Sequence, residues 1–277
     1  MITLGVFISY ITIKERKIVF DNKEIIDIVI NDTFKEDNIL KKMTNINTLD
    51  KDLVLLKKDY QEVVSNEKEE IIEPIIYLYN THQTEEYQTS IIGDYTLNPT
   101  VTMTNYILED IFNKNGYKVY VEERSIKEIL NNNNWNYASS YKASRIFLED
   151  IVQKHKSLKY FIDLHRDSLS HDKTTITIND RSYAKVIFLL GLENPNYNEN
   201  LEFIEKINNK IDEYYPGLSK GIYKKEGPGV NGVYNEDFSN RLILLEVGGY
   251  ENTTNEVLNT MIAFSKCYLE VLNEENH

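Results

Sequence analysis

From Ile71 onward, short apolar runs alternate with segments of helical spacing, and this alternation limits the fold more than any other feature. Predicted buried strands lie at Pro74–Tyr79, Tyr117–Val121, Tyr160–Leu164 and Leu242–Val247. Predicted helices lie at Val101–Asn115, Ala138–Lys156, Asn198–Tyr214 and Thr254–Leu272. Alternating strands and helices are typical of a largely parallel sheet. We therefore expect an α/β three-layer sandwich, with a mostly parallel twisted sheet and helices on both faces.

The segments between these elements give weaker signals. We expect polar or glycine-rich loops at Gln83–Pro99, Glu122–Tyr137 and Gly227–Ser239. Thr174–Ile178 and Ala184–Leu190 are expected to pair as strands around Asn179-Asp180-Arg181. A further strand is predicted at Gly221–Lys225.

Two regions are expected: an N-terminal appendage at residues 1–68 and a catalytic domain at residues 69–277. Within the appendage, Lys17–Asn31 is strand-like and Phe34–Val64 is predicted to form one or two short helices. The charge run Asn66–Glu70 predicts a solvated linker. The apolar stretch Met1–Ile13 is shorter than the roughly 20 residues of a membrane span. It also lacks the basic start and cleavage site of a signal peptide, so a core strand, the remnant of a membrane anchor and an interfacial segment all stay open.

Charge and cysteine content exclude some classes of protein. The formal net charge is −13, which argues against a nucleic-acid partner, because contacts to phosphates dominate such binding. A single cysteine, Cys267, excludes an internal disulfide and a cysteine-based zinc site. Its helical surroundings favour a buried, small apolar residue over a reactive thiol.

Three of the predicted strands end in residues that carry chemistry: His82 after the first, His165 after Tyr160–Leu164, and Glu246 inside Leu242–Gly249. In open α/β sheets, ligands bind at the carboxyl ends of the strands. Two imidazoles and one carboxylate are a common ligand set for catalytic zinc. Glu85 is our first choice for the carboxylate, because a turn can bring it back to His82; Glu86 is the alternative, and both would be exposed if neither binds metal.

The neighbours of His165 have expected roles of their own. If side chains alternate along the strand, Asp163 points the same way as His165 and can accept its free imidazole N–H. Arg166 would either pair with Asp167 or bind a substrate carboxylate. Glu246 lies among apolar residues, so desolvation is expected to raise its pKa and suit it to proton transfer; the alternative is an acid at an exposed strand edge.

These stretches together resemble the stage II sporulation protein P family, relatives of the zinc-dependent N-acetylmuramoyl-L-alanine amidases. The family's His-Thr-His-x-x-Glu-x-Tyr corresponds to Asn80–Tyr87, with Asn80 in place of the first histidine. Its Asp-x-His-Arg-Asp-Ser is matched in full by Asp163–Ser168. Further matches are Tyr234–Ser239, Leu244–Gly248, Asn252-Thr253 with Glu256, and Ser140–Ser144 followed by Arg145. In the first of these, Asn235 is a candidate either for supporting a metal ligand or for binding substrate.

The resemblance covers roughly residues 72–270 and implies a fold of the zinc amidase type. It implies a Zn²⁺ cofactor bound by His82, Glu85 and His165, with Glu246 as the proton-transferring acid. The implied reaction is hydrolysis of the amide between MurNAc and L-Ala in peptidoglycan during engulfment in sporulation. The implied location is the extracytoplasmic face of the cell membrane, and the implied partners are a lytic transglycosylase and a membrane scaffold. Two alternatives stay open: a metallopeptidase acting on peptide cross-links, and an inactive wall-binding relative.

Overall fold

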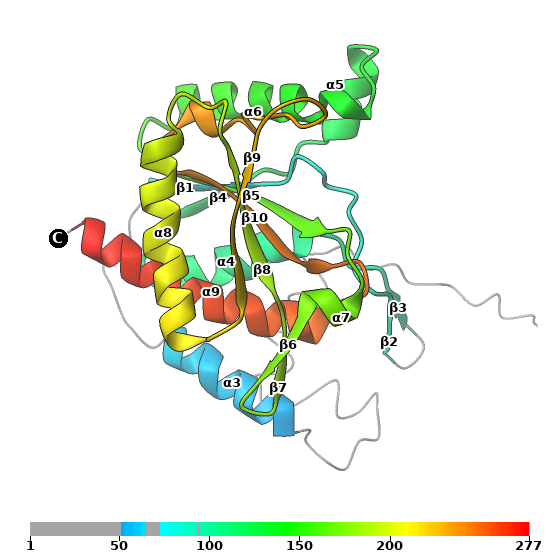
Figure 1. The fold of residues 1–277 in the computed structure, drawn as a ribbon, viewed down its shortest axis with the longest axis vertical. Coiled ribbons are helices and arrows are strands. Elements are labelled where there is room, and N and C mark those ends of the chain that lie inside the picture. Colours follow the sequence, from blue (N-terminus) through cyan, green and yellow to red (C-terminus); the bar gives the residue numbers. More distant parts are fainter. Residues whose placement is uncertain (1–50, 65–72, 93–94, 277) are drawn as a thin grey trace, which may run out of the picture.

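The computed structural model describes residues 51–64, 73–92 and 95–276 of the chain, and all structural statements concern these residues (Figure 1). The predictions for Met1–Ile13, Lys17–Asn31 and Asn66–Glu70 lie outside the described residues.

A six-stranded sheet forms the centre of the molecule. Its strands lie in the order β4 (Val119–Val121), β1 (Ile76–Tyr79), β5 (Tyr160–Asp167), β10 (Leu242–Gly249), β8 (Val186–Gly191) and β9 (Ser219–Lys225). Every neighbouring pair is parallel except β10 and β8. The predicted α/β fold with a mostly parallel sheet is therefore confirmed.

Helices cover both faces of the sheet, because successive side chains along each strand point to opposite faces. The side chains on one face pack in a core cluster with the helices α4 (Thr102–Lys114), α8 (Tyr197–Tyr214) and α9 (Thr254–Glu275): Ile76, Leu78, Ile162, Leu164, Ile243 and Leu245. The side chains on the opposite face pack against α6 (Ser140–Lys154): Tyr77, Tyr79, Phe161 and Leu242. In Figure 1, α6 and α9 accordingly lie on opposite sides of the sheet.

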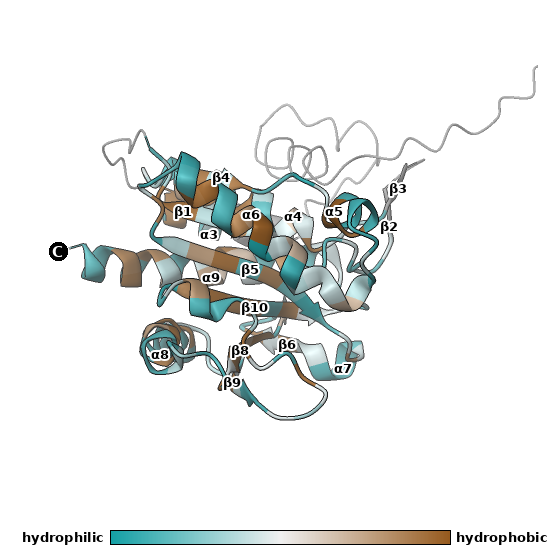
Figure 2. Ribbon diagram, turned by 90° about the horizontal axis from the view of Figure 1, so that it is seen from above, coloured by the Kyte–Doolittle hydropathy of each residue, from teal (hydrophilic) through white to brown (hydrophobic). Residues whose placement is uncertain are grey.

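The central strand β5 changes character along its length. It is apolar at its start and hydrophilic toward its C-terminal end (Figure 2), and its last two residues, Arg166 and Asp167, are only partly buried. The strand therefore leaves the core and carries polar side chains to the edge of the sheet.

The structure corrects the predictions for two segments. The region 122–137 is not a plain loop, because it contains the helix α5 (Ile126–Asn132), in which Ile126 and Leu130 are buried one turn apart. The Ser125 side chain accepts a hydrogen bond from the Glu128 backbone N–H and caps this helix. The partner of β6 (Thr175–Ile178) is β7 (Arg181–Ala184), whereas the predicted partner segment forms β8 in the main sheet.

Smaller elements complete the described chain. The polar segment 83–99 contains a short hairpin of β2 (Ser90–Ile92) and β3 (Tyr95–Leu97). One-turn helices are η2 (Tyr137–Ser139), α7 (His171–Thr174) and η3 (Glu236–Phe238).

The helix α3 (Lys51–Val64) lies within the predicted appendage and contacts α4 and α9. Tyr60 and Val63 are buried in the main core cluster, and Asp59 pairs with Arg181. The boundary near residue 68 stays a prediction, but α3 packs against the helices α4 and α9 that cover the sheet. Among the described residues, no helix is long and apolar enough to cross a membrane.

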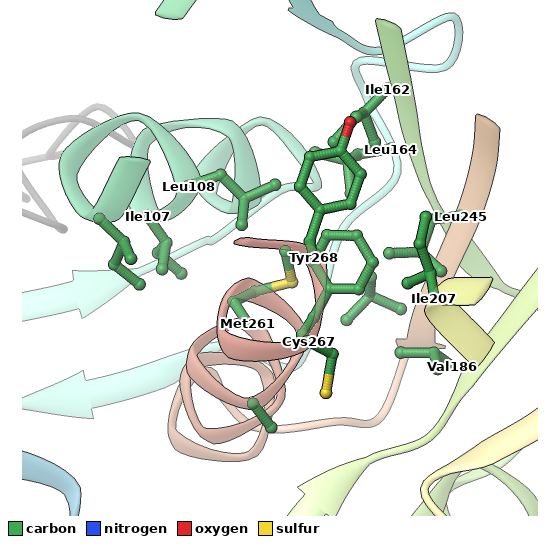
Figure 3. Close-up of a cluster of buried hydrophobic side chains, with 14 of the residues drawn as sticks. Ile107, Leu108, Ile162, Leu164, Val186, Ile207, Leu245, Met261, Cys267 and Tyr268 are labelled. Carbon is green, nitrogen blue, oxygen red and sulfur yellow. The ribbon is translucent and has the colours of Figure 1, made fainter. Parts of the chain in front are cut away.

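The core between the sheet and α9 contains the unsatisfied hydroxyl of Tyr268. Tyr268 is fully buried, and Figure 3 shows its hydroxyl directed toward Ile162 and Leu164. This oxygen has no hydrogen-bond partner among the described residues. Cys267, its neighbour, is a buried free thiol, as the sequence indicates.

We predict that Tyr268→Phe is neutral or stabilising, because burying a hydroxyl without a partner costs about 1–3 kcal/mol. Tyr268→Ala keeps no ring and leaves a cavity, so it should lower the free energy of unfolding by about 3–5 kcal/mol. Urea unfolding of both variants checks this. A phenylalanine variant as unstable as the alanine variant would contradict it.

Candidate metal centre

Three neighbouring parallel strands bring the candidate residues to one edge of the sheet. In the register of these strands, Tyr79 of β1 lies beside Asp163 of β5, and His165 of β5 lies beside Glu246 of β10. His82 follows β1 after two further residues. The register of the three strands therefore brings their C-terminal ends together, as the sequence predicts.

His82, Glu85 and His165 form a compact cluster. Their ligand atoms all lie within 4.8 Å of one another. Nδ1 of His82 lies 3.4 Å from one carboxylate oxygen of Glu85, and Nδ1 of His165 lies 3.7 Å from the other. The two imidazole rings are nearly perpendicular, with centroids 4.9 Å apart.

Asp163 occupies the other side of the His165 ring. Its carboxylate is completely buried, and its Oδ1 lies 3.0 Å from Nε2 of His165. Nε2 is not aligned to donate a hydrogen bond to it, so the contact is electrostatic. Because this carboxylate faces Nε2, Nδ1 is the nitrogen left to face Glu85.

The residues between β1 and His82 hold Asp163 in place. Thr81 donates to Asp163 from both its backbone N–H and its hydroxyl, at 2.8 and 2.6 Å. Asn80, which stands where the resemblance places a histidine, donates to the Leu164 carbonyl at 2.7 Å and accepts from Asn105 at 2.6 Å. Asn80 is 2% exposed, so it links β1, β5 and α4 from within the protein.

Glu85, and not Glu86, shares the cluster with the histidines. The Glu86 residue is exposed, and its contact with the site is made by its backbone carbonyl, which accepts from Nε of Arg166. Glu85 instead accepts from the Arg166 backbone N–H at 3.0 Å. The role of either as a metal ligand stays a prediction, and the geometry favours Glu85.

The protonation of the cluster reflects its mutual contacts. Burial alone would raise the pKa of Glu85, but both imidazoles and the Arg166 N–H outweigh it and lower that pKa to about 2. Burial likewise opposes the charged form of His165, but the carboxylates of Asp163 and Glu85 raise its pKa to about 10. The positive charge of the protonated His165 thus lies in a cage formed by the carboxylates of Asp163 and Glu85.

Glu246 is a partly buried acid next to this cage. Burial raises the pKa of its carboxyl, and the charge of Asp167 adds to this effect, while His165 opposes it. The direction agrees with the one expected from its apolar neighbours in the sequence. Gly248 and Gly249 end β10, and a side chain at Gly249 is excluded because its Cβ would lie 2.3 Å from the Leu169 carbonyl oxygen.

Arg166 and Asp167 do not pair through their side chains. Asp167 lies 3.3 Å from the Lys220 ammonium, and Nη1 of Arg166 donates to the Asp167 backbone carbonyl at 3.2 Å. Of the two sequence-based roles for Arg166, the side-chain pairing is therefore absent from this structure.

Sequence reasoning gave no role to two tyrosines that pack on the imidazoles of His82 and His165. Tyr137 stacks on His82, with ring centroids 4.9 Å apart. Tyr141 meets His82 edge-on at 5.5 Å and stacks beside His165 at 6.2 Å. Their spacing of one helical turn is a signal for a shared face, but the sequence predicts a loop up to Tyr137 and therefore does not indicate this contact.

Sequence reasoning also gave no role to the buried acid Glu236. It follows Tyr234 and Asn235, which both have positive φ, and one of its oxygens accepts from the Gly191 backbone N–H at 2.6 Å. Its other oxygen has no partner among the described residues, and burial raises its pKa to about 9. Asn235 donates to the Tyr141 carbonyl and the Ser144 hydroxyl, so its amide anchors this loop to α6; the substrate-binding role stays a prediction.

The cluster fits a zinc ion. Tetrahedral zinc with bonds of ~2.0–2.1 Å keeps its ligand atoms about 3.4 Å apart, close to the contacts between Glu85 and the two imidazoles. Two imidazole nitrogens and one carboxylate also match the donor set of catalytic zinc sites. Among the described residues, this is the group of such side chains close enough to hold a metal.

Comparison with known proteins places this chain in a family. The family model "Stage II sporulation protein P (SpoIIP)" matches residues 8–268. The stage II sporulation protein P of Bacillus subtilis (strain 168) is 34% identical over 203 residues, which are 71% of this chain and 51% of that protein. The mixed α/β fold and the site thus occur in a chain that belongs to the stage II sporulation protein P family. The chain spans about half the length of the B. subtilis relative.

The solved structures that match this chain have low sequence identities and low TM-scores. N-acetylmuramoyl-L-alanine amidase AmiC2 of Nostoc punctiforme is 11% identical, with a TM-score of 0.41 over 72% of this chain and 97% of that one. Cwp6 from Clostridium difficile is 12% identical, with a TM-score of 0.42 over 72% and 29%. A metallo-carboxypeptidase from Burkholderia cenocepacia is 11% identical, with a TM-score of 0.37 over 74% and 58%.

We predict that Asp163→Asn weakens zinc binding by about 10–100-fold, because a carboxylate next to a ligand imidazole fixes the ring and increases its basicity. Calorimetric zinc titration at pH 7 measures the change. Asp237→Asn is the matched control, since Asp237 pairs with Arg145 outside the cluster. Equal zinc affinity in wild type and Asp163→Asn would contradict the prediction.

A pH dependence follows from Glu236. Its folded-state pKa of about 9 lies above the ordinary value of 4.5, so the protonated acid is favoured by folding. Its contribution to stability is full below about pH 4.5 and is lost as the pH rises toward 9. Glu236→Gln mimics the neutral acid, so from pH 5 to pH 9 it should gain at least about 1 kcal/mol in unfolding free energy relative to wild type. Parallel pH profiles for the two proteins in urea unfolding would disprove this.

Proposed function

We propose that this chain is a zinc-dependent N-acetylmuramoyl-L-alanine amidase that cleaves peptidoglycan during sporulation. One observation carries the proposal: two imidazoles and a carboxylate converge directly beside a partly buried acid on the adjacent strand. Membership in the stage II sporulation protein P family supports the biological setting. The zinc, the MurNAc–L-Ala specificity and the residue roles are all part of the proposal.

His82, Glu85 and His165 would hold the zinc, and Asp163 would orient His165 through its buried contact with Nε2. When bound, the zinc supplies Lewis-acid polarisation of the scissile carbonyl and activation of water. The Tyr137 and Tyr141 rings pack on the ligand imidazoles and limit their rotation.

Glu246 would be the general base and then the general acid. It accepts a proton from the attacking water through its carboxylate oxygen and delivers it to the nitrogen of the leaving L-Ala. Burial and the nearby Asp167 raise the pKa of this carboxyl, which brings it closer to neutral pH, where proton transfer in both directions is efficient.

The setting of the reaction is also proposed. A cell-wall substrate requires action on the extracytoplasmic face of the cell membrane. A lytic transglycosylase and a membrane scaffold are the partners that we propose, because cutting glycan and peptide bonds together opens the wall. Residues 1–68 would serve as the anchor-proximal appendage.

We predict that Glu246→Gln lowers the cleavage of purified sacculi by at least about 100-fold while zinc remains bound at one ion per chain. Turbidity clearance measures cleavage, and metal analysis by mass spectrometry measures zinc. Glu226→Gln, which changes an exposed glutamate, is the matched control and should clear sacculi as wild type does. An active Glu246→Gln variant would remove Glu246 from its role.

Product analysis separates the alternatives. An amidase leaves intact glycan chains and stem peptides with a free N-terminal L-Ala. New free amino groups within the cross-links would indicate the alternative metallopeptidase. Zinc-loaded wild-type protein that clears no sacculi would indicate an inactive wall-binding relative.

A further inference from the structure

Arg166 has an unusual position for an arginine in an acidic chain. It follows the proposed zinc ligand His165 directly on β5, and its backbone N–H donates to the carboxylate of Glu85. Its backbone is therefore held at the same edge of the sheet as the candidate metal centre.

Among the described residues, no carboxylate lies within ion-pair distance of the Arg166 guanidinium. The nearest acidic neighbours are engaged elsewhere, with Glu85 between the imidazoles and Asp167 beside Lys220. Other arginines of the described chain are paired differently: Arg145 lies between Glu149 and Asp237. Within the described part of the chain, the charge of Arg166 is thus left without a matching anion.

The guanidinium is nevertheless held in a fixed orientation. Nε donates to the Glu86 carbonyl at 3.0 Å and Nη1 to the Asp167 carbonyl at 3.2 Å. It lies over the ring of Tyr250, 6.0 Å from the centroid, and Tyr250 is 45% exposed. Since a guanidinium carries five N–H donors, at least three remain, and those of Nη2 have no acceptor among the described residues.

This arrangement suits the binding of a carboxylate. A planar guanidinium with free N–H groups matches a carboxylate in two parallel hydrogen bonds. Because backbone carbonyls already hold the guanidinium in place, less conformational entropy is lost when a carboxylate binds. In a chain of net charge −13, such a cation is also needed to admit an anionic ligand to a site rich in carboxylates.

We propose that Arg166 binds the free α-carboxylate of the residue that follows L-Ala in the stem peptide and so positions the peptide for cleavage. The inference rests on the proposed amidase function. The sugar side of the scissile amide offers no carboxylate, because its lactyl carboxyl is part of that amide. The anion must therefore come from the peptide side. Because Nε of Arg166 donates to the carbonyl of Glu86, directly after the proposed ligand Glu85, we expect the anion to belong to a residue near the cut.

The test uses two substrates that differ in one group. MurNAc–L-Ala–D-Glu has a free α-carboxylate next to L-Ala, and MurNAc–L-Ala–D-isoglutamine has a carboxamide there. Wild type should cleave the carboxylate substrate with a kcat/KM about 10–100-fold higher, as expected for charge-assisted hydrogen bonds. Arg166→Gln should lose this preference, with its main effect on the carboxylate substrate, and Arg166→Lys should keep only part of it.

Arg145→Gln is the matched control, because it removes an arginine that already has carboxylate partners. It should leave the preference between the substrates unchanged. Zinc content and melting temperature are measured for every variant, since Arg166 also holds the Glu86 backbone. A wild type without preference, or an Arg166→Gln variant that slows both substrates equally, overturns the proposal.

A binding measurement separates this inference from the proposed function. Calorimetry with the peptides L-Ala–D-Glu and L-Ala–D-isoglutamine needs no turnover. Tighter binding of the first peptide to wild type, and equal binding to Arg166→Gln, supports the role of Arg166 even if neither muramoyl substrate is cleaved. Equal binding of both peptides to wild type contradicts it, whether or not the protein is an amidase.

Discussion

The candidate metal centre depends on the buried carboxylate of Asp163. A charge without solvent is costly unless hydrogen bonds and opposite charge surround it. Here Thr81 donates to both of its oxygens, and the His165 ring lies beside it. Because the Asp163 carboxylate needs hydrogen-bond donors and a nearby positive charge, it holds both Thr81, the residue before His82, and the ring of His165 in place.

The parallel register of β1, β5 and β10 converts this contact into a site. Because neighbouring positions on parallel strands face the same side, Asp163 and His165 of β5 point toward α6, and Glu246 lies beside His165. At the start of α6, the Tyr141 ring stacks beside the His165 imidazole, and the Ser144 hydroxyl is hydrogen-bonded to the Thr81 hydroxyl. Arg166, one residue later, leaves the core with its charge unneutralised. The proposed chemistry and the proposed substrate contact thus follow from a single strand end.

Much of this could be predicted from the sequence, because it depends on local spacing. Strand alternation placed Asp163 with His165, and a three-residue turn placed Glu85 near His82. The failures concern contacts between distant segments. The pairing of Asp167 with Lys220 joins β5 to β9, and the antiparallel insertion of β8 beside β10 leaves no periodic signal. Tyr137 was overlooked because the asparagine-rich segment before it concealed the two-residue apolar face of α5.

The most direct test of this account is a crystal structure of the zinc-loaded protein with anomalous scattering measured at the zinc edge. The account predicts one strong anomalous peak at about 2.0–2.2 Å from His82, Glu85 and Nδ1 of His165, with Asp163 still against Nε2. A zinc ion bound elsewhere, or bound to Asp163 in place of Glu85, would contradict it.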